Sequence, residues 1–178
     1  MLQFNKIQLI KEECGMRKIS CFLMIAISLI ALSACQKKYN TPSELCDIIR
    51  QEADITADEK INYVGSCAKD GYALLWYISG DDIYNLEYIP AACYFTSENK
   101  YIFIQTYKPM DRGDNIAVLQ WHGGYSFLVN NTECKQIKIR NGAEIKGIPV
   151  TQYPFVYYND IIPNEYDFLD KDGNVLTH

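Results

Sequence analysis

Tyr72-Ala73-Leu74-Leu75-Trp76-Tyr77-Ile78 is the stretch that sets the fold class of this chain. It is rich in apolar and strand-forming residues, and it ends at Ser79-Gly80-Asp81-Asp82, a cluster typical of turns. The stretch therefore predicts a β-strand that leaves through a tight turn. Residues 83–89 are its expected hairpin partner, with Pro90 as the end of that partner.

The chain after this strand repeats the same plan. Further hairpins are predicted from pairs of strand-like segments separated by turn residues: 93–96 with 101–107, 115–121 with 125–130, 135–140 with 143–148, and 165–169 with 175–176. Glycine or asparagine in the turns accepts the positive φ that short hairpin loops require. A run of hairpins predicts an antiparallel meander sheet that curls or packs on itself, in a barrel-like or sandwich-like way.

One short helix is predicted ahead of the strands. Thr41-Pro42-Ser43-Glu44 has the pattern of a capping box, with Pro42 at the first helical position. Leu45, Cys46, Ile48 and Ile49 then recur at helical spacing up to about Ala53. The expected fold class is a β-rich α+β domain with one short N-terminal helix, stapled by disulfides.

The N-terminal region has the three parts of a secretory signal. Met16-Arg17-Lys18 is a positive segment, residues 19–31 are apolar, and small residues precede Cys35. Leu32-Ser33-Ala34-Cys35 resembles the lipobox of bacterial lipoproteins. A transmembrane helix is the alternative, but it needs about 20 apolar residues, and residues 19–34 supply only 16.

The lipoprotein resemblance implies that the protein is located at a membrane. Residues 16–34 would be a signal peptide, and Cys35 would carry a thioether-linked diacylglycerol with a further palmitate-type acyl chain. Two or three chains anchor durably, since each buried methylene contributes about 0.8 kcal/mol. Gln36 in place of aspartate resembles the outer-membrane sorting pattern of a Gram-negative cell. The expected location is the outer membrane, facing the periplasm.

The resemblance also divides the chain. Residues 1–15 place acidic side chains ahead of the positive segment, which indicates an upstream leader and a translation start at Met16. Residues 35–41 form the lipidated cysteine and a short tether. Residues 42–178 are expected to form a single β-rich periplasmic domain.

Four of the seven cysteines remain once the signal and the lipidated residue are removed: Cys46, Cys67, Cys93 and Cys134. An even number in an oxidising compartment predicts two disulfides. Of the three possible pairings, the favoured one joins Cys46 to Cys67 and Cys93 to Cys134. The spacings match no zinc pattern, so no metal and no cofactor are expected.

The charge of the chain excludes one class of partner. Residues after Cys35 carry 13 basic and 20 acidic side chains, a formal net charge of −7. A nucleic-acid binder needs a cationic footprint for phosphates. Nucleic acid is therefore not an expected partner, and the membrane is reached through the lipid.

Several motifs have ordinary structural interpretations. His122 is the only histidine before His178 and the only candidate base for a Ser-His-Asp site, yet its Trp-His-Gly-Gly setting predicts an exposed turn. Asp170–Asn174 departs from the calcium-loop pattern and indicates a hairpin turn. Arg112-Gly113-Asp114 is typical loop chemistry. Asp81, Asp82 and Glu87 could pair for acid–base work, but nothing fixes their separation. No catalytic residue is assigned.

Aromatic residues crowd the C-terminal part of the chain. The candidate binding residues there are Tyr153, Phe155, Tyr157, Tyr158 and Tyr166. Exposed tyrosine is enriched where proteins bind partners; the alternative is that these rings complete a small core. We expect a lipoprotein that binds another protein in the periplasm, such as an immunity or inhibitor protein. The alternatives are an accessory or structural subunit of an envelope assembly and, with less support, an envelope hydrolase.

Overall fold

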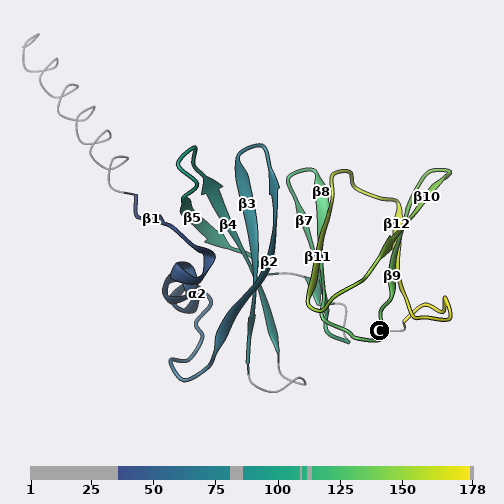
Figure 1. Cartoon of the computed structure of the whole chain (residues 1–178), viewed down its shortest axis with the longest axis horizontal. Coiled ribbons are helices and arrows are strands. Elements are labelled where there is room, and N and C mark those ends of the chain that lie inside the picture. Colours follow the sequence, from purple (N-terminus) through teal and green to yellow (C-terminus); the bar gives the residue numbers. More distant parts are fainter. Residues whose placement is uncertain (1–35, 81–85, 109, 112–113, 177–178) are drawn as a thin grey trace, which may run out of the picture. The chain divides into compact units, whose positions relative to one another are not determined.

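The strand predicted at residues 72–78 is β3 (Tyr72–Ser79) in the computed structural model (Figure 1). The structure describes residues 36–80, 86–108, 110–111 and 114–176. The predicted leader, signal peptide and lipobox lie outside these residues, as do Asp81, Asp82, Arg112, Gly113 and His178. Among the described residues, no helix is long and apolar enough to cross a membrane.

The described elements are one 3₁₀ helix, one α-helix and a series of strands. In chain order they are β1 (Lys38–Tyr39), η1 (Pro42–Leu45), α2 (Cys46–Glu52), β2 (Ile61–Lys69), β3, β4 (Glu87–Phe95), β5 (Tyr101–Thr106), β6 (Met110–Asp111), β7 (Ile116–Trp121), β8 (Gly124–Val129), β9 (Gln136–Asn141), β10 (Glu144–Pro149), β11 (Phe155–Asn159) and β12 (Glu165–Leu169).

The strands form three antiparallel sheets. The first has the order β1-β5-β4-β3-β2, the second β11-β8-β7-β6, and the third β10-β9-β12. The hairpins predicted around residues 97–100, 122–124 and 141–142 are β4–β5, β7–β8 and β9–β10. The expected β-rich, antiparallel, curled fold with one short helix is therefore confirmed (Figure 1).

Strand β3 is buried on both faces, which explains its unbroken apolar sequence. Ala73, Leu75 and Tyr77 enter a first core cluster, where Leu45 and Ile49 of the helical segment cover the sheet. The alternate residues of β3 enter a second cluster with β7 and β8; they are Leu74, Trp76 and Ile78. The first sheet is thus held between the helix on one face and the second sheet on the other.

Strand β8 repeats this two-sided burial one layer further on. Leu128 belongs to the second cluster, whereas Phe127 and Val129 point to a third cluster. Ile137 of β9 and Phe168 of β12 complete that third cluster from the third sheet. Four layers therefore follow one another: helix, sheet, sheet and sheet. All lie in Lys38–His178, which forms one compact unit, so a fragment beginning at Gln36 keeps every described element.

A buried polar contact and a close approach join the first two sheets. The indole Nε1 of Trp76 donates a hydrogen bond to Ser126 Oγ at 2.8 Å, and both residues are fully buried. Gly65 of β2 lies against Val156 of β11, and an ideal Cβ at Gly65 would stand 2.7 Å from Val156 Cγ2. The absence of a side chain at Gly65 therefore allows β2 to meet β11.

Two strand predictions were wrong. Pro90 was expected to end its strand, but it lies inside β4, opposite Trp76. Pairing of β4 with β5 begins at Ala91, and the Pro90 carbonyl accepts the N–H of Tyr107 at 2.8 Å, so the missing N–H of Pro90 falls at the end of that ladder. Strands β2 and β11 were not predicted, since β2 has little apolar alternation and β11 follows a proline-rich segment.

The helix start also differs from the prediction. Thr41 makes no side-chain cap, and residues 42–45 form a 3₁₀ turn before the α-helix. Glu44 does reach back as a capping box requires, but its carboxylate accepts the N–H of Asn40 at 2.8 Å. The reciprocal contact is therefore displaced by one residue from the predicted Thr41.

The predicted disulfide staple is absent: all four cysteines are free thiols. Cys46 packs in the first cluster, whereas Cys67 packs in the second, on the opposite face of the first sheet. Cys93 is in the first cluster and Cys134 is in the third. Both favoured pairings are therefore wrong, because a sheet separates the two members of each pair and a disulfide spans only about 4–7 Å between Cα atoms.

Candidate functional site

The predicted C-terminal binding residues mostly complete the core. Tyr153, Phe155, Tyr157 and Tyr166 are partly buried and pack against the third cluster, and Tyr158 packs against the second. Tyr166 makes an edge contact with Phe127 at 5.2 Å between ring centres. The structure divides the five residues between two sides of the second sheet, so they do not form one surface.

Two of these tyrosines hold lysines on the surface. The Tyr153 hydroxyl donates to the Cys134 carbonyl and accepts from Lys135 Nζ at 3.0 Å. The Tyr157 hydroxyl accepts from Lys146 Nζ at 3.0 Å, and this ammonium lies 5.7 Å from the centre of the Tyr157 ring. The pKa of Lys146 is raised, first by its hydrogen bond to Tyr157 and then by the electrostatic interaction with the same tyrosine. Both tyrosine hydroxyls are therefore engaged within the domain.

A different set of rings meets at the tips of the strands, and we call it the hairpin-tip patch. Its members are Tyr72, Tyr94, Trp121, His122 and Tyr158. Ring centres are 5.7 Å apart for Tyr72 and Tyr94, 4.7 Å for Tyr72 and His122, 4.4 Å for Trp121 and His122, and 5.6 Å for Trp121 and Tyr158. Four segments distant in the chain thus supply one continuous series of ring contacts, part of which is exposed.

Local geometry places each ring of the hairpin-tip patch. Tyr72 and Tyr94 are cross-strand partners in β3 and β4, and Trp121 closes the β7–β8 turn opposite Gly124. His122 adopts a positive φ of 43° in that turn. The Tyr158 hydroxyl donates to the carbonyl of His122 at 2.9 Å, with the Trp121 carbonyl at 3.2 Å. The patch is therefore fixed by strand register and by a side chain that ties β11 to the turn.

Gly124 is required beneath this patch. An ideal Cβ at Gly124 would lie 2.0 Å from the Asn159 carbonyl oxygen and 2.8 Å from the Tyr158 hydroxyl. Any side chain at this position would therefore push β11 and Tyr158 away from the β7–β8 turn.

The hairpin-tip patch combines exposed and buried groups. Tyr94 is 46% exposed and His122 is exposed, whereas Trp121 is only 4% exposed. The indole Nε1 of Trp121 is buried and has no hydrogen-bond partner in the part of the chain that the structure describes. Burial, and then Cys67, Asp160 and Asp70, raise the pKa of Tyr158, so two carboxylates act on this ring.

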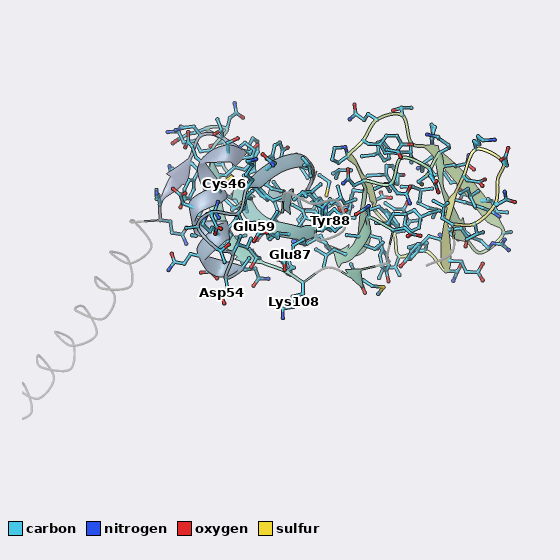
Figure 2. The ribbon with its side chains drawn as sticks, turned by 90° about the horizontal axis from the view of Figure 1, so that it is seen from below. Cys46, Asp54, Glu59, Glu87, Tyr88 and Lys108 are labelled. Atoms are coloured by element: carbon cyan, nitrogen blue, oxygen red, sulfur yellow. The ribbon has the colours of Figure 1, made fainter. Side chains whose placement is uncertain are left out.

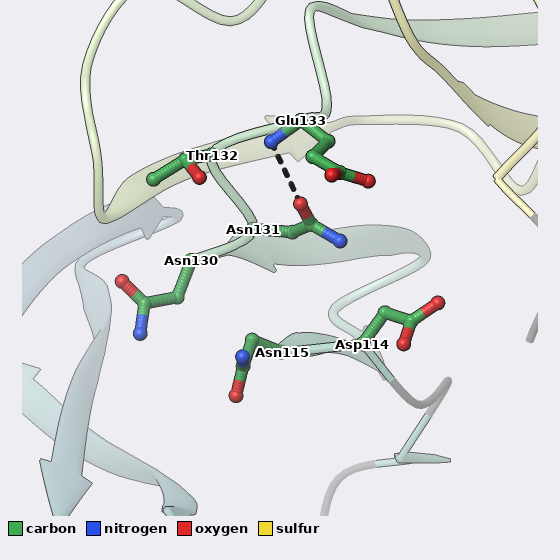
Figure 3. Close-up of a pocket in the computed structure, with 6 residues that line it drawn as sticks. All are labelled: Asp114, Asn115, Asn130, Asn131, Thr132 and Glu133. Atoms are coloured by element: carbon green, nitrogen blue, oxygen red, sulfur yellow. Dashed lines mark hydrogen bonds between the residues drawn. The ribbon is translucent and has the colours of Figure 1, made fainter. Parts of the chain in front are cut away.

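A polar pocket lies elsewhere on the domain, between the start of β7 and the loop after β8. Its volume is about 500 Å³. The lining residues are Asp114, Asn115, Asn130, Asn131, Thr132 and Glu133 (Figure 3). Asn131 Oδ1 accepts the N–H of Glu133 at 2.8 Å, which shapes the loop. Carboxylates, amides and a hydroxyl make this an oxygen-rich depression suited to polar groups.

The other sequence motifs are not brought together. Glu87 is exposed at the start of β4 beside Tyr88 (Figure 2), while its proposed partners lie outside the described residues. Asp170 forms the predicted hairpin turn, since its Oδ1 accepts the N–H groups of Asp172 and Asn174, each at 2.8 Å. Within the described residues, no cluster of three or more His, Cys, Asp or Glu side chains could hold a metal.

The four thiols occupy separate and partly hydrophobic positions. Cys46 lies on the helix side of the first sheet (Figure 2). Burial raises the pKa of Cys67 to about 11 and that of Cys93 to about 12. These two thiols are therefore protonated, and weak nucleophiles, at neutral pH.

Sequence reasoning found His122 as an exposed turn residue but missed its ring partners. Two of the contributing turns carry glycine directly beside a residue of the patch, in Gly71-Tyr72 and His122-Gly123. This local signal was present, but the convergence depends on which hairpin tips lie together.

Comparison with known proteins returns no match: no family model, curated protein or solved structure resembles the chain significantly.

Proposed function

We propose that this chain is a lipid-anchored protein of the bacterial cell envelope whose domain binds another protein through the hairpin-tip patch. The observation that carries the proposal is the patch itself, a joined set of aromatic rings with Tyr94 46% exposed. Tyrosine and tryptophan rings offer a large contact area at low entropy cost, and they are enriched among the residues that contribute most to protein interfaces.

The charge of the domain favours an immunity or inhibitor role. A formal charge of −7 after Cys35 would speed encounter with a basic toxin or envelope hydrolase. The lipobox-like Leu32-Ser33-Ala34-Cys35 would hold the domain at the periplasmic face of the outer membrane. An accessory subunit of an envelope assembly is the second candidate, and the same anchor and patch would serve it.

The anchor is tested by replacing its cysteine. Cys35→Ser in the full chain, expressed in a Gram-negative host, is expected to leave the membrane fraction or to accumulate uncut. Cys46→Ser is the matched control, since Cys46 is a thiol packed against the first core cluster, and it is expected to remain lipidated. Metabolic labelling with an alkyne palmitate reports the acyl chain directly. Equal labelling of the Cys35→Ser chain would contradict the anchor.

The binding role is tested by crosslinking in intact cells. A photo-crosslinking residue at position 94 is expected to capture one defined protein, whereas the same residue at position 104 is expected to capture none. Ile104 is the matched control because its exposed fraction, 46%, equals that of Tyr94. The same products from both positions, or none from position 94, would overturn the proposed surface.

A further inference from the structure

The hairpin-tip patch has carboxylates at its margin. Asp70 stands in the β2–β3 turn, two residues before Tyr72, and Asp160 directly follows β11, two residues after Tyr158. Both aspartates are exposed. Their charges also contribute to the raised pKa of Tyr158, after burial and Cys67. The aromatic surface is therefore bordered by negative charge from two separate strand ends.

Two cations stand close to the same surface. Lys69 pairs with Tyr72 across the β2–β3 ladder, and Asp160 contributes to the raised pKa of Lys146. The domain as a whole is nonetheless acidic, with a formal net charge of −7 after Cys35. Its field therefore favours a partner segment of positive sign.

Aromatic faces bordered by carboxylates suit one side chain in particular. The guanidinium of arginine is planar, stacks on aromatic rings and pairs with carboxylates through its fork of N–H groups. An ammonium is more strongly hydrated and stacks less well.

We propose that the hairpin-tip patch binds an arginine-bearing loop of a basic partner protein, with the guanidinium over Tyr72 and Tyr94 and beside Asp70 and Asp160. This inference rests on the proposed protein-binding function and names the chemistry of the partner. The two parts are separable, because a partner could occupy the same patch through apolar or sugar groups.

The test is a titration of the ¹⁵N-labelled full chain in uncharged detergent, followed by NMR. The probes are the peptide Gly-Arg-Gly-Arg-Gly, the same peptide with citrulline for arginine, and a trimer of N-acetylglucosamine. Citrulline keeps the shape of arginine and removes its charge. The arginine peptide is expected to shift the amides around Gly71, Tyr94 and His122, while the other two probes leave them unchanged.

Substitutions give the matched comparison. Tyr94→Ala is expected to weaken binding of the arginine peptide by about 2- to 30-fold, the range for cation–π contacts. Asp70→Asn is expected to weaken it by about 1.5- to 5-fold and to reduce its salt dependence. Lys69→Met is expected to strengthen it by a similar factor, which a purely structural role would not do. Ile104→Ala is the control and should change nothing.

The outcomes separate the two proposals. Equal shifts with the citrulline peptide or the sugar would overturn the arginine inference while leaving the patch as a binding surface. No shift with the arginine peptide at about 5 mM, a concentration that half-fills a site with a dissociation constant of about 5 mM, would also overturn it. Failure of the crosslinking at position 94 would instead overturn the protein-binding function beneath it.

Discussion

Ser126→Ala tests how the first two sheets are joined. Ser126 Oγ accepts the indole N–H of Trp76 at 2.8 Å and lies 3.5 Å from Cys67 Sγ. Serine and tryptophan are both fully buried, so water cannot replace the lost acceptor. Leaving such a donor unsatisfied costs about 1–3 kcal/mol. For a domain of this size that loss lowers Tm by roughly 3–9 °C.

The assay is urea unfolding of the fragment that begins at Gln36, followed by tryptophan emission. The fragment contains the only two tryptophans, Trp76 and Trp121, and both are buried, so their emission shifts to longer wavelength on unfolding. Ser97→Ala is the control, because Ser97 lies in the exposed turn between β4 and β5. We expect it to change the free energy of unfolding by less than about 0.5 kcal/mol.

A double-mutant cycle isolates the hydrogen bond from the packing. Trp76→Phe removes the indole. The loss of unfolding free energy that this substitution causes should be smaller by about 1 kcal/mol or more when Ser126→Ala is already present. A Ser126→Ala variant as stable as the parent, or additive costs in the cycle, would refute the inference that this bond joins the sheets.

Three further predictions follow from the same fragment. Gly65→Ala should destabilise the fragment by roughly 1–3 kcal/mol, because the added Cβ would meet Val156 Cγ2 at 2.7 Å. Adding Val156→Ala should restore part of the lost stability, as measured by urea unfolding. A double variant no more stable than Gly65→Ala alone would contradict the contact. All four cysteines are free, so iodoacetamide should modify all four after unfolding without reductant and none of the buried thiols in the native fragment at pH 7. Fewer than four additions to the unfolded chain, counted by mass spectrometry, would reveal a disulfide. Stability should fall as pH rises from about 9 toward 12, because burial raises the pKa of Cys67 to about 11 and that of Cys93 to about 12, above the usual thiol value of 9.0. The unfolded chain therefore releases these protons first. Cys67→Ala should show a shallower fall, and an unchanged slope would count against the buried thiol.

Burial on two faces was the feature that sequence patterns conveyed least well. The stretch at residues 72–78 shows no alternation, and sequence reasoning recognised it as a strand without placing a layer on each side. The disulfide prediction failed for the same reason. Cys67 pairs with Leu74 and Cys93 with Ala73, so adjacent positions of β3 send them to opposite faces. An even count of cysteines indicated disulfides, but sheet orientation keeps the favoured pairs apart.

The sequence by itself determined the class of fold and the outline of the chain. Hairpins arise from contacts close in sequence, and the turn residues between paired segments therefore specify them locally. The order of strands in the three sheets, the passage of β4 through Pro90 and the meeting of β2 with β11 depend on which apolar faces pack together. The hairpin-tip patch belongs to this second group. Tyr72 and Tyr94 meet across the β3–β4 pair, whereas His122 and Tyr158 come from the second sheet and its turn. Only the packing of one sheet on the next brings these two sets of rings into contact.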